Sequence, residues 1–244
     1  HGVDVDFVGF EGTPLPRAVT GDPRITVHRI DAPGRRPHGG QSAAAYASAA
    51  VSDAWQLSRR LRRVLKGLAP ADLVVVQSPP AFPAVAVCWS VLKRKQTRFI
   101  IDWHNLGYTL WRLRLGQWHP LVRLARWVER REARRADDNL SVSRGLSAFL
   151  ESKFGAKSHV LYDRPAAAFT PMERGERERF RQALFSRLGI RGTNVGFVVC
   201  PTSWTEDEDF DLVIEAVTWL EERIRGWESS GAGRRFADLV ILVT

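Results

Sequence analysis

A chain of 244 residues with 44% hydrophobic residues has enough apolar material for one large or two modest domains, which excludes an intrinsically disordered protein. The net charge of +9 is spread unevenly, because residues 1–165 hold 26 Lys/Arg and 14 Asp/Glu whereas residues 166–244 hold 10 and 13. The basic first part suits a phosphate group, a membrane surface or a nucleic acid. The sequence has no nucleic-acid recognition motif, so nucleic acid is the least favoured of these partners.

The ends of the chain and its apolar runs bear on where the protein works. No signal peptide is visible, and no apolar run approaches the roughly 20 residues of a membrane-spanning helix. The chain begins at His1 directly before one predicted strand and stops inside another, so we expect it to be an internal segment of a longer protein. Its cysteines, Cys88 and Cys200, lie in apolar runs and are predicted to be buried thiols of a reducing compartment.

Short runs rich in Val and Ile alternate along the chain with longer helical patterns, which is typical of βαβ units. The sequence predicts strands at residues 3–10, 25–30, 73–77, 99–102, 139–142, 159–161, 195–200 and 239–243. It predicts helices at residues 42–68, 119–136, 176–188 and 209–223, and loops at 13–22 and 31–40. The helix at 119–136 is predicted to bury Leu121, Leu124, Ala125 and Val128.

A domain boundary is predicted at Tyr162-Asp163-Arg164-Pro165, a turn-like sequence after the last strand of the basic part. We expect residues 1–165 to form one Rossmann-like domain and residues 166–244 to begin a second. The latter 79 residues are about half of a complete domain of that kind. The predicted fold class is therefore α/β, with two doubly wound domains, of which we expect the first to lack its first strand and the second to be truncated.

The segment Asp102-Trp103-His104-Asn105 directly follows an apolar strand, so it lies at the sheet edge where ligands bind in open α/β folds. The imidazole of His104 can accept or donate a proton near neutral pH, and Asp102 could orient it or act as the base itself. In the alternative interpretation, Asp102 caps a turn and His104 is an ordinary polar loop residue.

A second polar segment, at 202–210, follows the strand at 195–200 and precedes a helix. Thr202, Ser203, Trp204 and Thr205 are predicted to bind phosphate groups through the side-chain hydroxyls of the serine and the threonines, together with free backbone N–H groups at the start of this helix. The acidic residues that follow have the spacing of helix caps, and capping explains them without a metal ion.

An apolar helix after residue 79 and an arginine stripe could both face a lipid. Phe82 and Trp89 flank a Lys/Arg cluster and could form a hydrophobic wall against a membrane, or belong to a buried helix. The stripe is either a solvated face or a site for anionic headgroups, and it consists of Arg123, Arg126 and Arg130 together with Arg134. Tyr108, shortly after His104, is predicted to lie on a sugar-facing lip.

The segments at 102–105 and 202–210 together closely resemble the chitobiosyldiphosphodolichol β-mannosyltransferase family, and the likeness is also dense at 77–80, 119–122 and 162–165. The resemblance implies a GT-B glycosyltransferase whose domain 1–165 faces the acceptor and whose domain 166–244 binds the donor. The implied donor is GDP-mannose, the acceptor is dolichyl-diphosphate-linked chitobiose, and the transfer inverts the anomeric centre. Neither a metal nor another cofactor is implied.

The resemblance also implies roles for individual residues. His104 is the preferred base for the acceptor hydroxyl and Asp102 is the second candidate. The residues expected to face the acceptor or the membrane are Asn105, Tyr108, Phe82, Trp89, Arg123, Arg126 and Arg130. The implied location is the cytosolic face of the endoplasmic reticulum membrane, where other glycosyltransferases of the same pathway are further possible partners.

Three features of the family fall outside the sequence. The glycine-rich loop after the first strand would precede His1, the paired-glutamate motif would follow Thr244, and the anchor helix is not in this segment. We therefore expect the segment to be inactive alone. The sequence leaves open a GT-B transferase with another nucleotide sugar and a non-catalytic, membrane-associated scaffold subunit.

Overall fold

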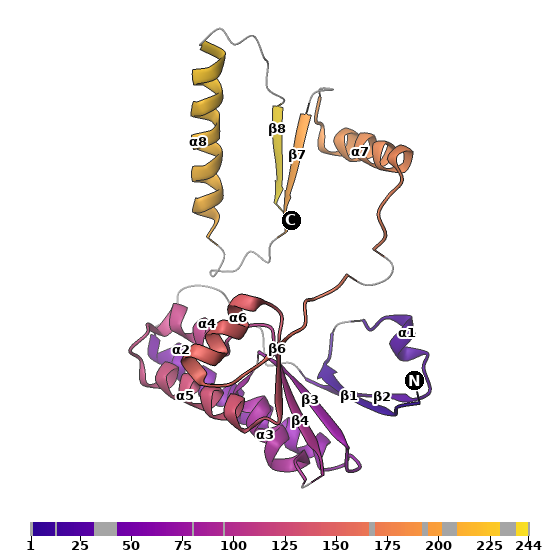
Figure 1. The fold of residues 1–244 in the computed structure, drawn as a ribbon, viewed down its shortest axis with the longest axis vertical. Helices are drawn as coiled ribbons and strands as arrows, with labels where there is room; N and C mark the ends of the chain where they lie inside the picture. Colours follow the sequence, from indigo (N-terminus) through magenta and orange to yellow (C-terminus); the bar gives the residue numbers. More distant parts are fainter. Residues whose placement is uncertain are drawn as a thin grey trace. The chain divides into compact units, whose positions relative to one another are not determined.

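The computed structural model describes residues 2–12, 14–31, 43–79, 81–94, 96–165, 169–191, 195–201, 209–229 and 238–243 (Figure 1). The chain divides into two compact units, His1–Asp163 and Arg164–Thr244. The dividing point lies within the tetrapeptide in which the sequence predicts a boundary. The assignment of an acceptor domain and a donor domain stays a prediction.

The first unit alternates strands and helices. Its elements are β1 (Val5–Phe10), α1 (Arg17–Thr20), β2 (Ile25–Ile30), α2 (Ala43–Leu65), β3 (Leu73–Ser78), α3 (Ala81–Leu92), β4 (Arg98–Trp103), α4 (Gly107–Leu115), α5 (Pro120–Arg135), β5 (Asp138–Ser141), α6 (Arg144–Phe149), the π-helical turn η1 (Leu150–Phe154) and β6 (His159–Val160). Every strand predicted in this unit is present. The predicted loop at 13–22 is wrong in part, because α1 lies within it.

The described strands of the first unit form two parallel sheets, β1-β2 and β3-β4-β5-β6. Residue pairing between β3 and β4 runs from Leu73 opposite Arg98 to Ser78 opposite Trp103. Because all four strands of the larger sheet run in one direction, their carboxyl ends share one edge. This edge carries the segment that follows β4, where the sequence predicts a site.

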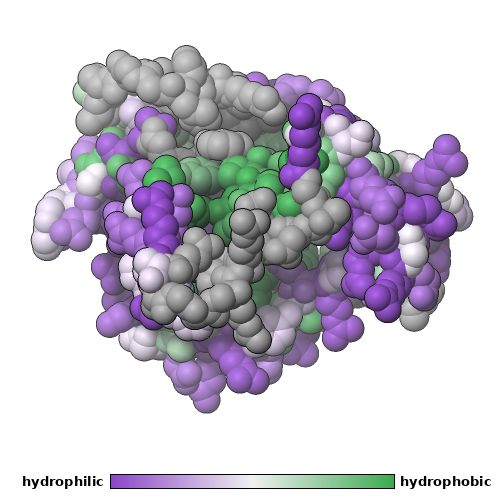
Figure 2. All heavy atoms as spheres, turned by 90° about the horizontal axis from the view of Figure 1, so that it is seen from above, coloured by the Kyte–Doolittle hydropathy of each residue, from purple (hydrophilic) through white to green (hydrophobic). Residues whose placement is uncertain are grey.

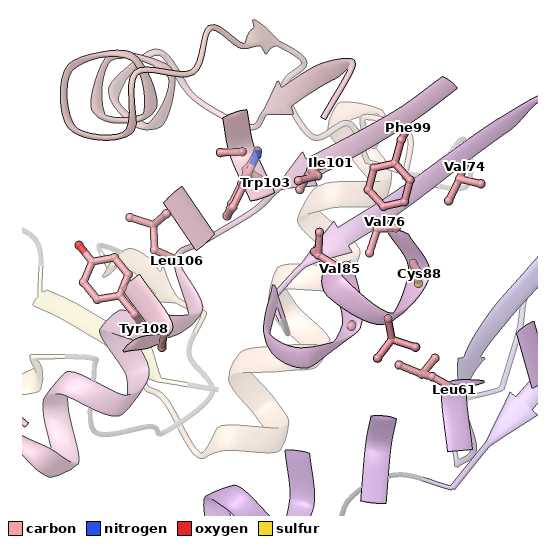
Figure 3. Packing of buried hydrophobic residues seen from close by; sticks show 14 of the residues in the cluster. Leu61, Val74, Val76, Val85, Cys88, Phe99, Ile101, Trp103, Leu106 and Tyr108 are labelled. Carbon is pink, nitrogen blue, oxygen red and sulfur yellow. The ribbon is translucent and has the colours of Figure 1, made fainter. Parts of the chain in front are cut away.

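The hydrophobic core lies on one face of the four-stranded sheet, and α2, α3, α4, α5 and η1 contribute to it. In β4, Phe99, Ile101 and Trp103 are fully buried, which fits the two-residue repeat of a strand. Figure 3 shows this packing, with Trp103, Leu106 and Tyr108 following one another from the end of β4 into α4. On the opposite face of β3, Leu73 and Val75 are about half exposed, so this strand is not buried on both faces.

Helix α5 buries part of the predicted face, because Ala125 is buried and Leu121 and Val128 are half-buried. Its buried residues are Val122, Ala125, Glu129, Glu132 and Ala133. Leu124, which was predicted to be buried, is 48% exposed. The prediction followed the leucines and did not consider that carboxylates could occupy an interior face.

An ion pair between Lys93 and Asp137 lies at the amino-terminal edge of the larger sheet. The Lys93 ammonium group donates a hydrogen bond of 2.6 Å to Asp137 Oδ2, which also accepts from the backbone N–H of Phe99 at 2.7 Å. The hydrogen bond from Lys93, helped by that of Phe99, lowers the pKa of Asp137 below its ordinary value. The positions of α3, β4 and β5 are thereby linked at the edge opposite the candidate site.

The second unit contains α7 (Arg174–Leu188), β7 (Val195–Cys200), α8 (Phe210–Ser229) and β8 (Asp238–Val243), and β7 pairs with β8 in parallel. Phe185 of α7 is buried and its ring lies 5.8 Å from that of Phe197 in β7. Both cysteines of the chain are free thiols. Cys88 is buried, and this burial raises the pKa of its thiol to about 12, whereas Cys200 is only half-buried, contrary to expectation.

Large apolar side chains remain exposed in both units. In a space-filling view, hydrophobic residues are visible near the centre and hydrophilic residues at the left, right and lower sides (Figure 2). Among the described residues, no helix combines the length and the apolar character that crossing a membrane requires.

Candidate active site

The segment after β4 is fixed to the end of β3 by the main chain. The backbone N–H of His104 donates to the carbonyl oxygen of Ser78 at 2.9 Å, and that of Asn105 reaches the same oxygen at 3.4 Å. Asp102 lies opposite Gln77 in β3 and Leu140 in β5. Two neighbouring strands therefore hold the position of the histidine at the carboxyl edge of the sheet.

The His104 ring lies between two carboxylates. Its Nε2 is 2.9 Å from Asp102 Oδ2, and its Nδ1 is 3.7 Å from Asp163 Oδ2. The side chain of His104 is 30% exposed and that of Asp163 is 72% exposed, so solvent and ligands can reach both. A partly exposed imidazole oriented by a carboxylate is the arrangement of a general base.

Trp103, the residue before His104, points into the core and not toward the ligand-binding edge of the sheet. It is fully buried, and its indole N–H donates to Asn139 Oδ1 at 2.8 Å. Asn139 in turn donates to the carbonyl oxygen of Ala133 at 2.9 Å, and the Trp103 ring meets Phe154 edge to face. These contacts fix the residue that directly precedes His104.

Replacing Trp103 with phenylalanine is expected to lower the free energy of unfolding by about 1–3 kcal/mol, because Asn139 Oδ1 would lose its donor inside the core. Urea unfolding followed by circular dichroism measures this change. Trp118, which is 80% exposed, offers the matched control, and its replacement with phenylalanine should leave the stability unchanged. Equal stability of the two variants would contradict the role given to the indole hydrogen bond.

A buried glutamate holds the start of α4, directly after the histidine segment. Glu129 of α5 is 1% exposed, and its Oε1 accepts the backbone N–H of Tyr108 at 2.8 Å. Burial raises the pKa of Glu129 to about 8, although hydrogen bonds from the backbones of Tyr108 and Gly107 oppose this shift. The side chain of Leu106, at the N-cap position of α4, makes no capping hydrogen bond. Glu129, which lies on α5, instead accepts a backbone N–H from the first turn of α4.

Glu129 and the contact of Asp163 with His104 were not predicted from the sequence. A signal for Glu129 is present, because it lies four residues from both Ala125 and Ala133 on one face of a helix. Asp163 belongs to the predicted boundary motif, and nothing in the sequence pairs it with His104. Within the described part of the chain, buried side-chain oxygens without a hydrogen-bond partner occur on Ser78, Glu129 and Glu132.

Two residues predicted to face the acceptor, Asn105 and Tyr108, differ in their exposure to solvent. Asn105 is exposed and its Oδ1 accepts from the backbone N–H of Leu106 at 2.8 Å. Tyr108 is 6% exposed, and the Arg126 guanidinium lies 5.8 Å from the centre of its ring. A contact of Asn105 or Tyr108 with the acceptor stays a prediction.

The residues predicted to face a lipid lie in different parts of the first unit. Trp89 packs edge to face on Phe99 at 5.1 Å, and the Arg135 guanidinium lies 4.6 Å from its ring centre. Arg123 and Arg130 are exposed on α5. The Phe82 side chain lies outside the described residues. Membrane contacts of these side chains stay predictions.

The predicted donor-phosphate residues Thr202, Ser203, Trp204 and Thr205 lie outside the described residues. The elements on either side are described: β7 ends at Cys200 and α8 begins at Phe210, with Asp209 Oδ1 accepting the backbone N–H of Leu212 at 3.3 Å. The segment thus connects the carboxyl end of a strand to the start of a helix. Among the described residues, no group of three or more His, Cys, Asp or Glu is gathered as a metal site would require.

Parallel strands joined by helices, with a histidine and two carboxylates at the carboxyl edge of the sheet, define an α/β domain of the class that binds ligands at this edge. A family model described as "Glycosyl transferase 4-like domain" matches residues 1–163, and the chain belongs to this family. The fold is therefore of GT-B type, as predicted from the sequence.

Named relatives agree with the resemblance found in the sequence. A chitobiosyldiphosphodolichol beta-mannosyltransferase of Arthroderma benhamiae is 36% identical over 61% of this chain and 35% of its own length. The protein of that name in Eremothecium gossypii is 31% identical over 90% of this chain and 47% of its own length. A protein of Arabidopsis thaliana named UDP-glycosyltransferase TURAN is 31% identical over 63% of this chain and 40% of its own length. The chain thus spans less than half the length of each of these relatives.

Proposed function

We propose that the natural polypeptide carrying this chain is an inverting mannosyltransferase that moves mannose from GDP-mannose to dolichyl-diphosphate-linked chitobiose. The names of the relatives and the family of the chain support the reaction class and the acceptor. The observation on this chain that carries the proposal is His104, whose two ring nitrogens face Asp102 and Asp163 at the ligand-binding edge of the sheet. GDP-mannose as the donor is the finer part of the proposal.

In this mechanism His104 is the general base. The acceptor hydroxyl oxygen attacks the anomeric carbon of mannose, the hydroxyl proton passes to His104, and the bond from the anomeric carbon to the diphosphate breaks with its electron pair leaving on GDP. A single displacement of this kind inverts the anomeric centre. Asp102, at 2.9 Å, orients the imidazole and stabilises the positive charge that it gains.

The departing diphosphate needs hydrogen-bond donors and positive charge. We place it between Thr202, Ser203, Trp204 and Thr205 and the start of α8, because hydroxyl groups and backbone N–H groups at the start of a helix bind anionic phosphate oxygens. Neither a metal ion nor another cofactor has a part in this proposal. An acceptor carried on dolichol further supports a location at the endoplasmic reticulum membrane, and we propose its cytosolic face.

A donor assay tests the proposal. We expect the natural polypeptide to transfer mannose from GDP-mannose to a chitobiosyl-diphosphate lipid. Unlabelled GDP should inhibit this transfer, and unlabelled UDP should inhibit it only weakly. The product should carry a β-linkage. A folded protein that transfers no mannose under these conditions would refute the assignment, and the non-catalytic scaffold would then be the leading interpretation.

The donor nucleotide has one specific competitor. The Arabidopsis relative carries the name UDP-glycosyltransferase, so a transferase that uses a UDP-sugar is the second candidate function. The same assay decides between the two. Transfer from a UDP-sugar that unlabelled UDP inhibits, without use of GDP-mannose, would replace the donor while leaving the reaction class in place.

A further inference from the structure

An apolar groove opens between α2, α4 and α5, away from the contacts of His104. It has a volume of about 310 Å³ and is lined by Val51, Ala54, Trp55, Ser58, Trp111, Leu121, Leu124 and Ala125. That volume is at the lower end of the range of small-molecule pockets. The Ser58 hydroxyl donates to the carbonyl oxygen of Ala54 at 2.7 Å, so this polar atom of the lining is already satisfied by its own helix.

The rim of the groove exposes large apolar side chains to solvent. Trp55 is 59% exposed, Val51 is 52% exposed and Leu124 is 48% exposed. Trp127, three residues after Leu124 along α5 and 57% exposed, extends this rim. Contiguous exposed apolar surface of this kind marks an interaction site more often than a bare solvent face.

The three helices that line the groove are strongly basic. The three helices carry twelve arginines, at 59, 60, 62, 63, 112, 114, 123, 126, 130, 131, 134 and 135. Their acidic residues are Asp53, Glu129 and Glu132, and both glutamates are buried. Asp53 follows Val51 by two residues, which places it on the opposite side of α2 from the groove. Arg60 and Arg134 make contacts elsewhere, with Asp31 and with the Phe154 carbonyl oxygen, but the remaining excess of arginine still attracts anions to these helices.

Arginine and tryptophan are paired on the rim. The Arg59 guanidinium lies 4.6 Å from the centre of the Trp55 ring, and the Arg131 guanidinium lies 5.6 Å from that of Trp127. Arg62, which follows Ser58 by four residues, continues the groove face of α2. Tryptophan rings with arginine heads beside them are typical of protein surfaces that lie at the boundary between lipid headgroups and acyl chains.

We propose that this face docks on an anionic lipid bilayer, with the rim of the groove in the headgroup boundary and Arg59, Arg62 and Arg131 against lipid phosphates. Charge complementarity selects an anionic occupant over a neutral one, and the exposed rim with its tryptophan–arginine pairs favours a bilayer over an acidic protein surface. The proposal goes beyond sugar transfer, because docking needs neither donor nor acceptor. Helix α4, which carries Trp111, begins three residues after His104, so docking would bring the candidate active site close to the bilayer.

Vesicle flotation tests the proposal. The chain is mixed with vesicles of phosphatidylcholine, or of phosphatidylcholine with added phosphatidylinositol, and the floated fraction is measured. We expect binding to the anionic vesicles that weakens as salt is added. The triple variant Arg59→Gln, Arg62→Gln and Arg131→Gln should bind the same vesicles roughly tenfold more weakly or worse, since each basic residue near such a surface contributes.

A matched pair of tryptophans separates docking from a general effect of surface change. Trp219 in α8 is 58% exposed and has Arg223 at 4.8 Å from its ring, much as Trp55 has Arg59. Trp55→Ala should reduce the floated fraction severalfold and Trp219→Ala should leave it unchanged, with circular dichroism confirming that both fold. Equal binding by Trp55→Ala and Trp219→Ala, or equal binding to neutral vesicles, would overturn the proposal.

Sedimentation of the same proteins tests whether a second copy of the chain occupies the groove instead of a bilayer. If the chain fails to float with anionic vesicles and Trp55→Ala instead dissociates an oligomer, the groove is an interface between copies and the bilayer proposal is wrong. If the chain neither floats nor self-associates, the proposal is also wrong. Both results are independent of mannose transfer, so a failure here leaves the proposed function standing.

Discussion

Replacing His104 with alanine is expected to lower mannose transfer by the natural polypeptide roughly 100-fold or more, because a positioned general base contributes at least that factor to a rate. The loss should lie in kcat, since the base acts only as the proton leaves the acceptor hydroxyl. Imidazole added to the assay should restore part of the lost rate, which a purely structural role would not allow. Transfer to the chitobiosyl-diphosphate lipid at saturating GDP-mannose measures the effect.

His28 provides the matched control for this variant. Its Nε2 lies 2.7 Å from Asp6 Oδ1, and its side chain is 27% exposed, against 30% for His104. His28→Ala removes the same kind of contact from another part of the same unit and should leave transfer intact. An equal loss in both variants would trace the effect to stability, and full activity of His104→Ala would shift the base to Asp102.

Most of the framework of this chain could be predicted from the sequence, because buried parallel strands are short apolar runs between turn residues. The strand at 25–30 and the strand at 195–200 agree with the structure at both ends. Helix α4 was missed, since 107–115 holds exposed Leu and Arg residues without a clear periodicity. Its first turn is stabilised by Glu129, a contact across 21 positions in sequence that no local pattern reveals.

The contacts of the candidate site likewise include some that local sequence predicts and some that depend on the tertiary fold. Asp102 lies near the end of β4 and His104 directly follows this strand, so their contact follows from local geometry and the sequence predicts it. Asp163 reaches His104 only because β6 returns the chain to the sheet beside β5. The predicted interior of α5 was wrong at Leu124, because the rule that apolar residues face inward gives no weight to a buried carboxylate. Tertiary contacts therefore account for what the sequence did not reveal.

Glu129 is the basis for the second large effect, a dependence of stability on pH. Its ordinary pKa is 4.5 and burial raises the folded value to about 8, so the folded chain keeps a proton that the unfolded chain releases between these two values. The stabilisation from this proton is fully present below pH 4.5 and is lost as the pH rises through 8. Each pH unit in this window lowers the free energy of unfolding by about 1.4 kcal/mol, which amounts to several kcal/mol in all.

The variant Glu129→Gln isolates this contribution. Its amide oxygen can still accept the N–H of Tyr108, and its amide does not titrate, so this side chain adds no pH dependence. Urea unfolding of both proteins between pH 5 and pH 8 should show similar stability at the acidic end and a growing advantage of the variant toward the alkaline end. Groups such as Asp137, whose lowered pKa makes stability fall at acidic pH, are common to both proteins and cancel in the difference.

The same comparison bears on the active site, because Glu129 holds the first turn of α4 directly after His104 and Asn105. Glu129→Ala leaves the N–H of Tyr108 without its partner in the core, which should cost about 1–3 kcal/mol relative to Glu129→Gln at any pH and loosen the histidine segment. Mannose transfer should therefore fall in Glu129→Ala and persist in Glu129→Gln. A difference between wild type and Glu129→Gln that does not change with pH would show that Glu129 is ionised in the folded chain. The glutamate would then act at α4 as a charged cap.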